Sequence, residues 1–357
     1  MSSGKVFLRK RVRSPFARLI NLFLLTLGLI LFTSPVIHAF DKIGTTGATF
    51  LKIGIGARAT SLAGAFVSLA DDPSASYWNP GGLGFQRIMA VEGGYNLWFG
   101  GIKQGYLYSV FPIGMYTTLG VGINSLSSGK IEITTLEEPE GNGLFYRYSG
   151  TVLSLAISRL LSSTFSMGIG LKGIQEVLWR EEARTFALDF GALYHTEFKG
   201  LDLGLCLSNI GGRMHLEGPD LSLPVQPPGA GGAHPEIEGV LKTGNWPLPA
   251  LFRVGITQEL IGSRGILKDS GNSKGRLILQ GTHHSEARQE ASLALEYELP
   301  PWLSMRGGWK VGADEETWSI GIGVGLHWGK GMTRLDYAIT NMGRLGLVNR
   351  VSLLRLF

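Results

Sequence analysis

Cysteine is almost absent from this sequence, because Cys206 is the only cysteine among 357 residues. A single cysteine excludes an intramolecular disulfide and a metal site built from several thiolates, so we expect Cys206 to serve as a small apolar side chain. Charged residues are scarce as well, at 17%, and with 44% hydrophobic residues this excludes intrinsic disorder. After residue 39 no run of 18 apolar residues occurs, so no transmembrane helix is expected there.

The net charge of +5 comes from the N-terminus alone. Residues 1–39 hold six basic residues and no acidic one, and the rest of the chain has 27 basic residues against 28 acidic ones. The charge balance therefore gives no reason to expect a nucleic-acid partner.

Residues 1–39 have the pattern of a signal peptide. A basic stretch precedes an apolar run from Leu19 to Phe32, and small residues follow up to Ala39. As a helix this run would be about 21 Å long, which is short for a membrane span. We predict cleavage after Ala39 and export from the cytoplasm. Because Ile37 is large for a position two residues before a cleavage site, an uncleaved N-terminal anchor is the alternative.

Glycine is abundant, with 52 residues, and much of it lies in segments that alternate with apolar residues. Fourteen such segments, separated by turns, are expected to be strands. They lie near 89–99, 102–111, 117–124, 151–159, 166–175, 186–195, 201–209, 251–260, 275–283, 291–299, 304–311, 318–328, 333–340 and 349–357. Membrane-spanning strands need about 9–11 residues, whereas strands of soluble proteins average about five or six. We therefore predict an all-β, transmembrane antiparallel β-barrel of about 14 strands over residues 87–357, with a soluble β-sandwich as the alternative.

The segment between Trp318 and Trp328 shows the alternation most clearly. Its even positions are all apolar, and its odd positions hold serine, glycine and histidine. Ten steps of about 3.3 Å, tilted by about 40°, cover about 25 Å of height, which matches the apolar band of outer-membrane barrels. We predict that Trp318 and Trp328 mark the two membrane interfaces.

The connections between the predicted strands alternate in length. The two longest, 125–150 and 210–250, fall at the same end of the barrel, although Gly100-Gly101 is short there and 261–274 is long at the other end. Short turns of outer-membrane barrels face the periplasm. We therefore predict that the two long connections are external and that both termini are periplasmic. The chain ends on Phe357, which resembles the terminal aromatic residue recognised by the barrel-assembly machinery.

Sequence motifs for enzymatic chemistry are not found. Gly168-Ile-Gly170-Leu-Lys-Gly173 fits G-x-G-x-x-G, but it lies within an alternating strand rather than before a helix. His283 and His284 are adjacent on a strand and point to opposite faces, so they cannot bind one metal ion together. No P-loop or H-E-x-x-H motif occurs. We predict a non-enzymatic protein without a cofactor or a metal ion.

Residues 40–86 precede the strands and are rich in glycine and alanine. A short helix is expected over Ser61–Ala70, followed by turns. The interior of a 14-strand barrel is too wide for its own side chains to fill, so we predict that residues 40–86 form a hatch inside the barrel. Glycines that face the lumen would let the hatch approach the wall closely. A periplasmic tail with one structural turn is the alternative.

Three stretches of the N-terminal region carry a family resemblance, together with the last two strands. They are Phe50-Leu-Lys-Ile-Gly-Ile-Gly-Ala-Arg-Ala, Leu62-Ala-Gly-Ala-Phe-Val-Ser-Leu-Ala-Asp-Asp-Pro and Tyr77-Trp-Asn-Pro-Gly-Gly-Leu, with Asp336-Tyr-Ala, Leu345-Gly and Asn349-Arg-Val-Ser-Leu near the C-terminus. In these stretches the chain resembles the PorV/PorQ family of outer-membrane proteins, which are relatives of the FadL-type fatty-acid channels. Gly81 stands where that family usually has alanine. Arg355 stands where the C-terminal barrel-assembly signal prefers an aromatic or apolar residue.

The resemblance implies a 14-stranded barrel with an N-terminal hatch, located in the outer membrane. PorV serves protein secretion, so we favour a component of secretion or surface export that binds secretion-system proteins or exported cargo. The alternative is a FadL-like passive channel for hydrophobic small molecules such as long-chain fatty acids. In either case outer-membrane lipid and the barrel-assembly machinery are expected partners. Candidate residues for ligand binding or gating, with structural turn formation as the alternative, are Asp71, Asp72, Tyr77, Trp78, Asn79, Pro80 and Gly81.

Overall fold

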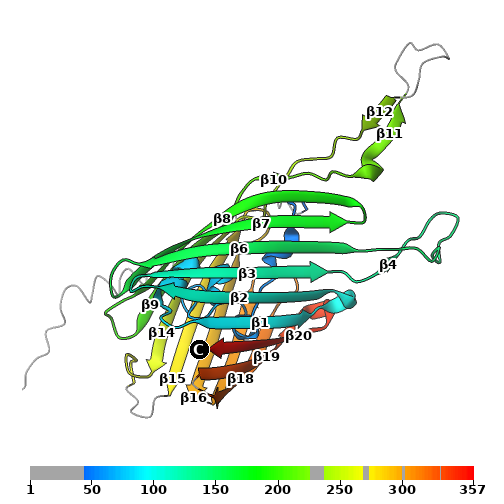
Figure 1. The fold of residues 1–357 in the computed structure, drawn as a ribbon. Coiled ribbons are helices and arrows are strands. Elements are labelled where there is room, and N and C mark those ends of the chain that lie inside the picture. Colours follow the sequence, from blue (N-terminus) through cyan, green and yellow to red (C-terminus); the bar gives the residue numbers. More distant parts are fainter. Residues whose placement is uncertain (1–43, 226–236, 268–272, 300–301, 330) are drawn as a thin grey trace, which may run out of the picture. The chain divides into compact units, whose positions relative to one another are not determined.

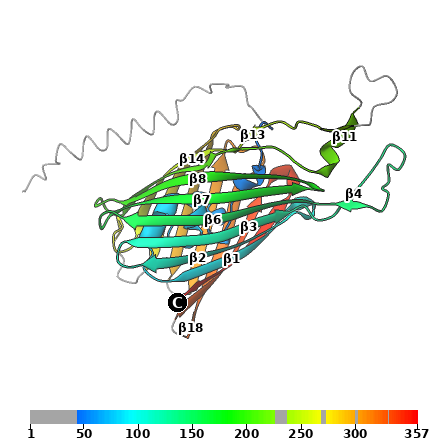
Figure 2. The ribbon, with the colours of Figure 1, turned by 45° about the horizontal axis from the view of Figure 1, so that its top comes forward.

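Fourteen antiparallel strands form a closed barrel in the computed structural model (Figures 1 and 2). The structure describes residues 44–225, 237–267, 273–299, 302–329 and 331–357, so the predicted signal peptide lies outside the described residues. The ring closes where the first strand pairs with the last, with Ala90 opposite Leu356. None of the helices in these described ranges is long and apolar enough to cross a membrane.

The barrel strands follow one another in chain order around the ring. They are β1 (Ala90–Leu97), β2 (Lys103–Ile113), β3 (Thr117–Ser127), β6 (Tyr148–Leu160), β7 (Phe165–Leu178), β8 (Glu181–His195), β9 (Leu201–Gly211), β14 (Leu251–Ile261), β15 (Lys274–His284), β16 (Glu290–Leu299), β17 (Leu303–Val311), β18 (Trp318–Trp328), β19 (Gly331–Asn341) and β20 (Leu347–Leu356).

The remaining elements are short. Outside the barrel, three two-stranded sheets pair β4 (Ile131–Glu132) with β5 (Phe145–Tyr146), β10 (Arg213–Met214) with β13 (Trp246–Pro247), and β11 (Ser222–Val225) with β12 (Ile237–Val240). The helical turns are η1 (Thr49–Lys52), α2 (Ala57–Ser61), α3 (Ala75–Trp78), η2 (Pro80–Phe85), η3 (Phe99–Gly101), η4 (Pro219–Leu221) and η5 (Gly343–Leu345).

The prediction of a transmembrane antiparallel barrel of about 14 strands is confirmed, and the closed ring excludes the soluble β-sandwich. Every predicted strand is present. The largest difference in a boundary is at β8, which begins at Glu181 rather than near residue 186. Its first residues are polar and show no apolar alternation, but they extend the ladder because Glu181 pairs with Leu178 of β7.

The two faces of each strand differ as the alternation predicts. In β18, Ile320 is 51% exposed and Leu326 is 62% exposed on the outside, whereas Ser319 points into the barrel and is 1% exposed. An apolar outer belt of this kind is suited to contact with lipid. Trp318 and Trp328 are the first and last residues of β18.

The connections make the two ends of the barrel different. We call the end with the connections 128–147 and 212–250 the long-loop end, and the opposite end the short-turn end. In Figure 1 the hairpins β4–β5 and β11–β12 extend from the long-loop end. Phe357 lies at the short-turn end, where its amide donates to the carbonyl of Met89 at 3.0 Å. The connection 262–273, between β14 and β15, is long at this end, as the sequence suggested.

Residues 44–86, which we call the inner segment, cross the interior of the barrel. At the long-loop end the amide of Gly47 donates to the carbonyl of Pro247 at 3.0 Å. At the short-turn end the hydroxyl of Thr118 donates to the carbonyl of Gln86 at 3.2 Å. Gly47 and Phe357 therefore lie at opposite ends of the barrel. Residues 1–43 lie outside the described part of the chain, so the periplasmic location of both termini stays a prediction.

The helix predicted over Ser61–Ala70 is wrong. The helix is α2, Ala57–Ser61, and residues 62–70 form turns. Ala63 adopts a left-handed conformation, with φ of 52°, which a continuing α-helix does not allow. Further along, the amide of Phe66 donates to the side-chain oxygen of Gln280 on the barrel wall at 3.0 Å. The backbone of this stretch thus bonds partly to the wall, an alternative that an alanine-rich sequence does not reveal.

Candidate functional site inside the barrel

Glycines of the barrel wall lie where the inner segment touches it. A Cβ atom on Gly168 of β7 would lie 2.3 Å from the carbonyl oxygen of Pro80, and one on Gly191 of β8 would lie 2.2 Å from the side-chain oxygen of Asn79. Both distances are far below van der Waals contact, so any other residue would push the inner segment away. The lumen-facing glycines therefore permit the close approach that the sequence suggested.

This contact predicts different effects for two neighbouring glycines of β7. Gly168→Ala should lower the free energy of unfolding by about 1–3 kcal/mol, the usual cost of overpacking, because backbone atoms of Pro80 cannot move aside easily. Gly170→Ala should have little effect, since its Cβ would meet Asp189 at an ordinary 3.4 Å. Urea unfolding in detergent, followed by tryptophan fluorescence, measures both. Equal stability of the two variants would contradict the contact.

The Asn79–Gly81 turn joins the inner segment to β8. Asn79 is fully buried; its amide nitrogen donates to the carbonyls of Val67 at 2.7 Å and Ala192 at 3.0 Å. Its side-chain oxygen accepts from the amide of Gly81 at 3.0 Å. A Cβ on Gly81 would lie 2.8 Å from the Cα of Ala192, so the alanine usual in the PorV/PorQ family does not fit this wall.

Tyr77 and Trp78 fold the inner segment back on itself. The Tyr77 hydroxyl donates to the carbonyl of Leu51 at 2.9 Å, and the Trp78 indole donates to the carbonyl of Ile55 at 3.1 Å. The guanidinium of Arg253 on β14 lies 5.8 Å from the Tyr77 ring and 5.3 Å from the Trp78 ring, within range of cation–π attraction.

Asp71 and Asp72 belong to a group of charged side chains near the short-turn end, which we call the lumen charge cluster. Its members are Arg58, Asp71, Asp72, Arg276, Glu296, Glu298, Arg306, Arg334 and Asp336. The first three come from the inner segment and the others from β15, β16, β17 and β19. The cluster therefore ties the inner segment to four strands of the wall.

Glu296 is the centre of the lumen charge cluster. Its carboxylate, which is completely buried, accepts from Arg58 at 2.8 Å, from Arg276 at 2.6 Å and from Arg306 at 2.8 Å. Arg58 also pairs with Asp71 and, at 3.3 Å, with Asp72. Sequence analysis missed this arrangement. The available signal was that arginine and glutamate occupy lumen-facing positions on neighbouring strands, where an outward residue would be apolar.

One part of the lumen near the long-loop end, bordered by β3, β6, β7 and β8, is apolar, whereas polar side chains such as Asn96, Gln104 and Arg350 are buried elsewhere at that end. We call this group the apolar mouth cluster, and its members are Ala48, Phe50, Leu51, Leu126, Val152, Ile174, Ala183, Ala187, Met214 and Leu248. Phe50 is 3% exposed, and a Cβ on Gly150 of β6 would lie 2.6 Å from its ring. Water-filled barrels have polar interiors. This part of the lumen is therefore suited to an apolar molecule rather than to an aqueous solute.

Comparison with solved structures identifies this architecture. The P. putida toluene transporter TodX superposes with a TM-score of 0.55 at 13% identity, covering 85% of this chain and 97% of that one. The fold is that of the FadL-type channels. The Ralstonia pickettii toluene transporter TbuX gives a TM-score of 0.52 at 13% identity, with the same coverage, and a Pseudomonas aeruginosa FadL homologue gives 0.50 at 12%, covering 84% of this chain and 97% of that one.

At these identities the likeness to the FadL-type channels concerns the fold. No family model matches the chain, and no curated protein shows significant sequence similarity to it. The relationship to FadL-type barrels implied by the sequence is thus supported at the level of architecture, whereas nothing in the comparisons points to the PorV/PorQ family in particular.

Proposed function

We propose that this protein is an outer-membrane channel through which hydrophobic small molecules diffuse, with the inner segment as its hatch. The apolar mouth cluster is the observation that carries the proposal, because it offers an apolar site at the mouth of a barrel that would otherwise be expected to have a polar lumen. Two proteins with this fold, TodX and TbuX, are toluene transporters. Protein secretion, the function favoured by the PorV/PorQ resemblance, becomes the alternative.

The two halves of the inner segment have different attachments, which suggests how the hatch works. Near the short-turn end, the lumen charge cluster and the Asn79 turn hold it to the wall. Near the long-loop end no such cluster reinforces the attachment among the residues that the structure describes. The bonds there include Lys52 with Glu286 at 2.7 Å, the Thr46 hydroxyl with Glu286, the Gly47 amide with the carbonyl of Pro247 at 3.0 Å and the Ala48 amide with Glu176 at 3.0 Å. A hydrophobic molecule that enters the apolar mouth cluster displaces Phe50, and the part of the inner segment near the long-loop end moves with it.

Uptake measurements test the channel. Expression in a Gram-negative host that lacks its own FadL-type channels should raise the initial uptake of radiolabelled toluene or oleate above the vector control. The double variant Val152→Thr/Ile174→Thr places two hydroxyls in the apolar mouth cluster and should lower that uptake about tenfold, because an apolar ligand leaves them without partners. Val240→Thr, the same change on the exposed hairpin β11–β12, is the control.

All variants are compared at equal amounts of folded barrel. The folded amount is measured from the difference in electrophoretic mobility between unboiled and boiled samples. Uptake no higher than in the vector control, with folded protein in the membrane, would reject the channel. Recovery of exported proteins with the tagged barrel would then support secretion.

A further inference from the structure

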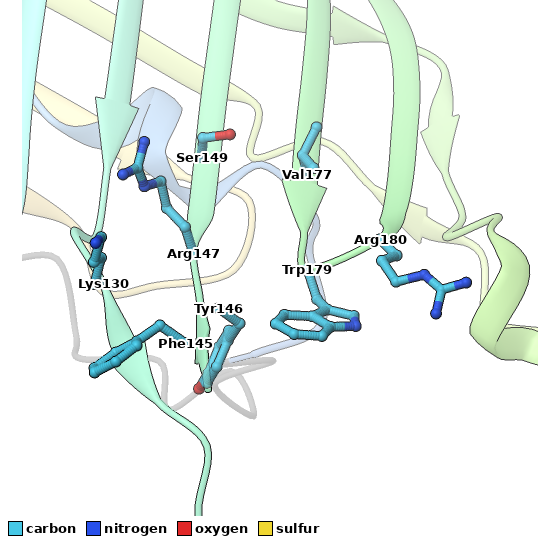
Figure 3. A pocket seen from close by; sticks show the side chains of 8 residues that line it. All are labelled: Lys130, Phe145, Tyr146, Arg147, Ser149, Val177, Trp179 and Arg180. Atoms are coloured by element: carbon cyan, nitrogen blue, oxygen red, sulfur yellow. The ribbon is translucent and has the colours of Figure 1, made fainter. Parts of the chain in front are cut away.

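An open pocket of about 480 Å³ lies at the long-loop end, on the outer face of β6 and β7 (Figure 3). We call it the rim pocket, and its principal side chains are Lys130, Phe145, Tyr146, Arg147, Trp179 and Arg180. Ser149 and Val177, which complete the lining, continue the outward-facing rows of β6 and β7. The rim pocket is therefore separate from the lumen and from the proposed channel.

The position of the rim pocket along β6 places it at a membrane interface. Ser149 lies ten residues from Arg159, an exposed basic residue at the short-turn end. At about 3.3 Å per residue and a tilt of about 40°, this separation corresponds to about 25 Å, the height of the apolar belt. Between the two, Leu153, Leu155 and Ile157 point outward and are 50–61% exposed. The acyl chains of lipids that cover this apolar belt therefore reach up to the rim pocket, where their headgroups begin.

The charge of the rim pocket is one-sided. It contains three cations, and none of the described residues that line it is acidic. Arg180 pairs with Asp220 at 2.9 Å. Lys130 and Arg147 have no carboxylate partner among the residues that the structure describes, and Lys130 lies 5.8 Å from the centre of the Phe145 ring. At least two positive charges are thus available to an anion.

The aromatic side of the rim pocket is built on an unusual turn. Trp179, between β7 and β8, has a φ of 62°, a conformation that a bulky residue rarely adopts. Its amide donates to the carbonyl of Arg147 at 3.2 Å, and its ring meets that of Tyr146 edge-on, with centroids 6.4 Å apart. Glycine or asparagine would fit this turn with less strain, so the indole itself is the feature that needs an explanation. Tryptophan and tyrosine are favoured at the headgroup level of membranes.

We propose that the rim pocket binds the phosphate group of a lipid in the leaflet next to the long-loop end. The guanidinium of Arg147 can donate two parallel hydrogen bonds to phosphate oxygens, and the ammonium of Lys130 can donate to them as well. The rings of Tyr146 and Trp179 pack against the part of the headgroup that joins the phosphate to its chains. Those chains then lie on the apolar rows below, which include Leu153 and Leu171. A soluble anionic peptide is a poorer match, because the apolar belt begins directly beneath the pocket.

Lipid titration of the full-length protein in an uncharged detergent, read out by native mass spectrometry, tests this site. The probe is diphosphoryl lipid A. Lys130→Gln/Arg147→Gln should weaken its binding by about tenfold or more, since charge-assisted hydrogen bonds are lost. Arg159→Gln/Lys199→Gln, which removes two exposed cations at the short-turn end, is the matched control and should bind lipid A as the unmodified protein does. Trp179→Ala should weaken binding as well.

Three outcomes would overturn the proposal. Equal lipid A binding by the two double variants would place the lipid elsewhere. Equal binding of a diacylglycerol, which has no phosphate, would show that the headgroup is not recognised. Full displacement of lipid A by inorganic phosphate would indicate a site for the free ion. The electrophoretic shift on boiling confirms that each variant is folded, and uptake of toluene by Lys130→Gln/Arg147→Gln should be unchanged because the rim pocket lies outside the lumen.

Discussion

Glu296→Gln is expected to lower the free energy of unfolding by about 3–5 kcal/mol, the largest loss among the substitutions considered. The carboxylate of Glu296 is inaccessible to water and accepts from three guanidinium groups, those of Arg58, Arg276 and Arg306. A neutral amide in its place removes the carboxylate that these three guanidinium groups share, and the amide NH₂ group would face other donors. Urea titration of the folded fraction by electrophoretic mobility measures the loss.

Glu298→Gln, two residues along the same strand, is the matched control. Its side chain is 15% exposed and lies 3.5 Å from Arg58 and 3.2 Å from Arg276, so water can partly replace the lost charge. We expect a loss of about 1 kcal/mol, typical of an accessible ion pair. If both variants lost the same stability, Glu296 would not be the centre of the cluster.

Asn79→Asp is expected to detach the inner segment while leaving the barrel folded. The Asn79 side chain donates to the carbonyls of Val67 and Ala192, and a carboxylate would instead set negative charge against both oxygens. Each buried group left without a partner costs about 1–3 kcal/mol, so the expected loss of stability is about 3 kcal/mol or more. Limited proteolysis should cut within residues 44–86, and the conductance in planar bilayers should rise.

Asn142→Asp provides the comparison for this substitution. The side chain of Asn142 only accepts, from the amide of Leu144 at 2.9 Å, and an aspartate carboxylate can accept the same bond. We expect unchanged protease resistance and conductance. An Asn79→Asp protein with the same resistance as Asn142→Asp would show that the turn does not hold the inner segment in place.

The strands could be predicted from sequence because lipid on one side and a filled lumen on the other impose alternation along every strand. β18 illustrates this, since all its apolar side chains fall on even positions. The turn at Asn79 was recognisable for a local reason, because asparagine followed by proline and glycines favours a turn. Gly168 and Gly191, the glycines of the wall that accommodate this turn, agree with the prediction that glycines face the lumen.

Features that depend on distant partners could not be predicted in this way. The turns of residues 62–70 replace a helix because Gln280, more than 200 positions away, bonds to the backbone there. Glu296 and Arg58 carry no local pattern, and only the closed ring brings them together. The position of Gly47 at the long-loop end depends likewise on its pairing with Pro247.

The pairing of β1 with β20 also restricts the order in which the molecule can be made. The inner segment precedes β1 in the chain and crosses the whole interior, from Gly47 near Pro247 to Gln86 near Thr118. Once the seam between β1 and β20 is sealed, the inner segment would have to thread lengthwise through one end of a closed barrel. Because residues 44–86 precede β1 in the chain, the wall can instead curl around them and the seam can close last. On this account the inner segment is the template around which the barrel closes.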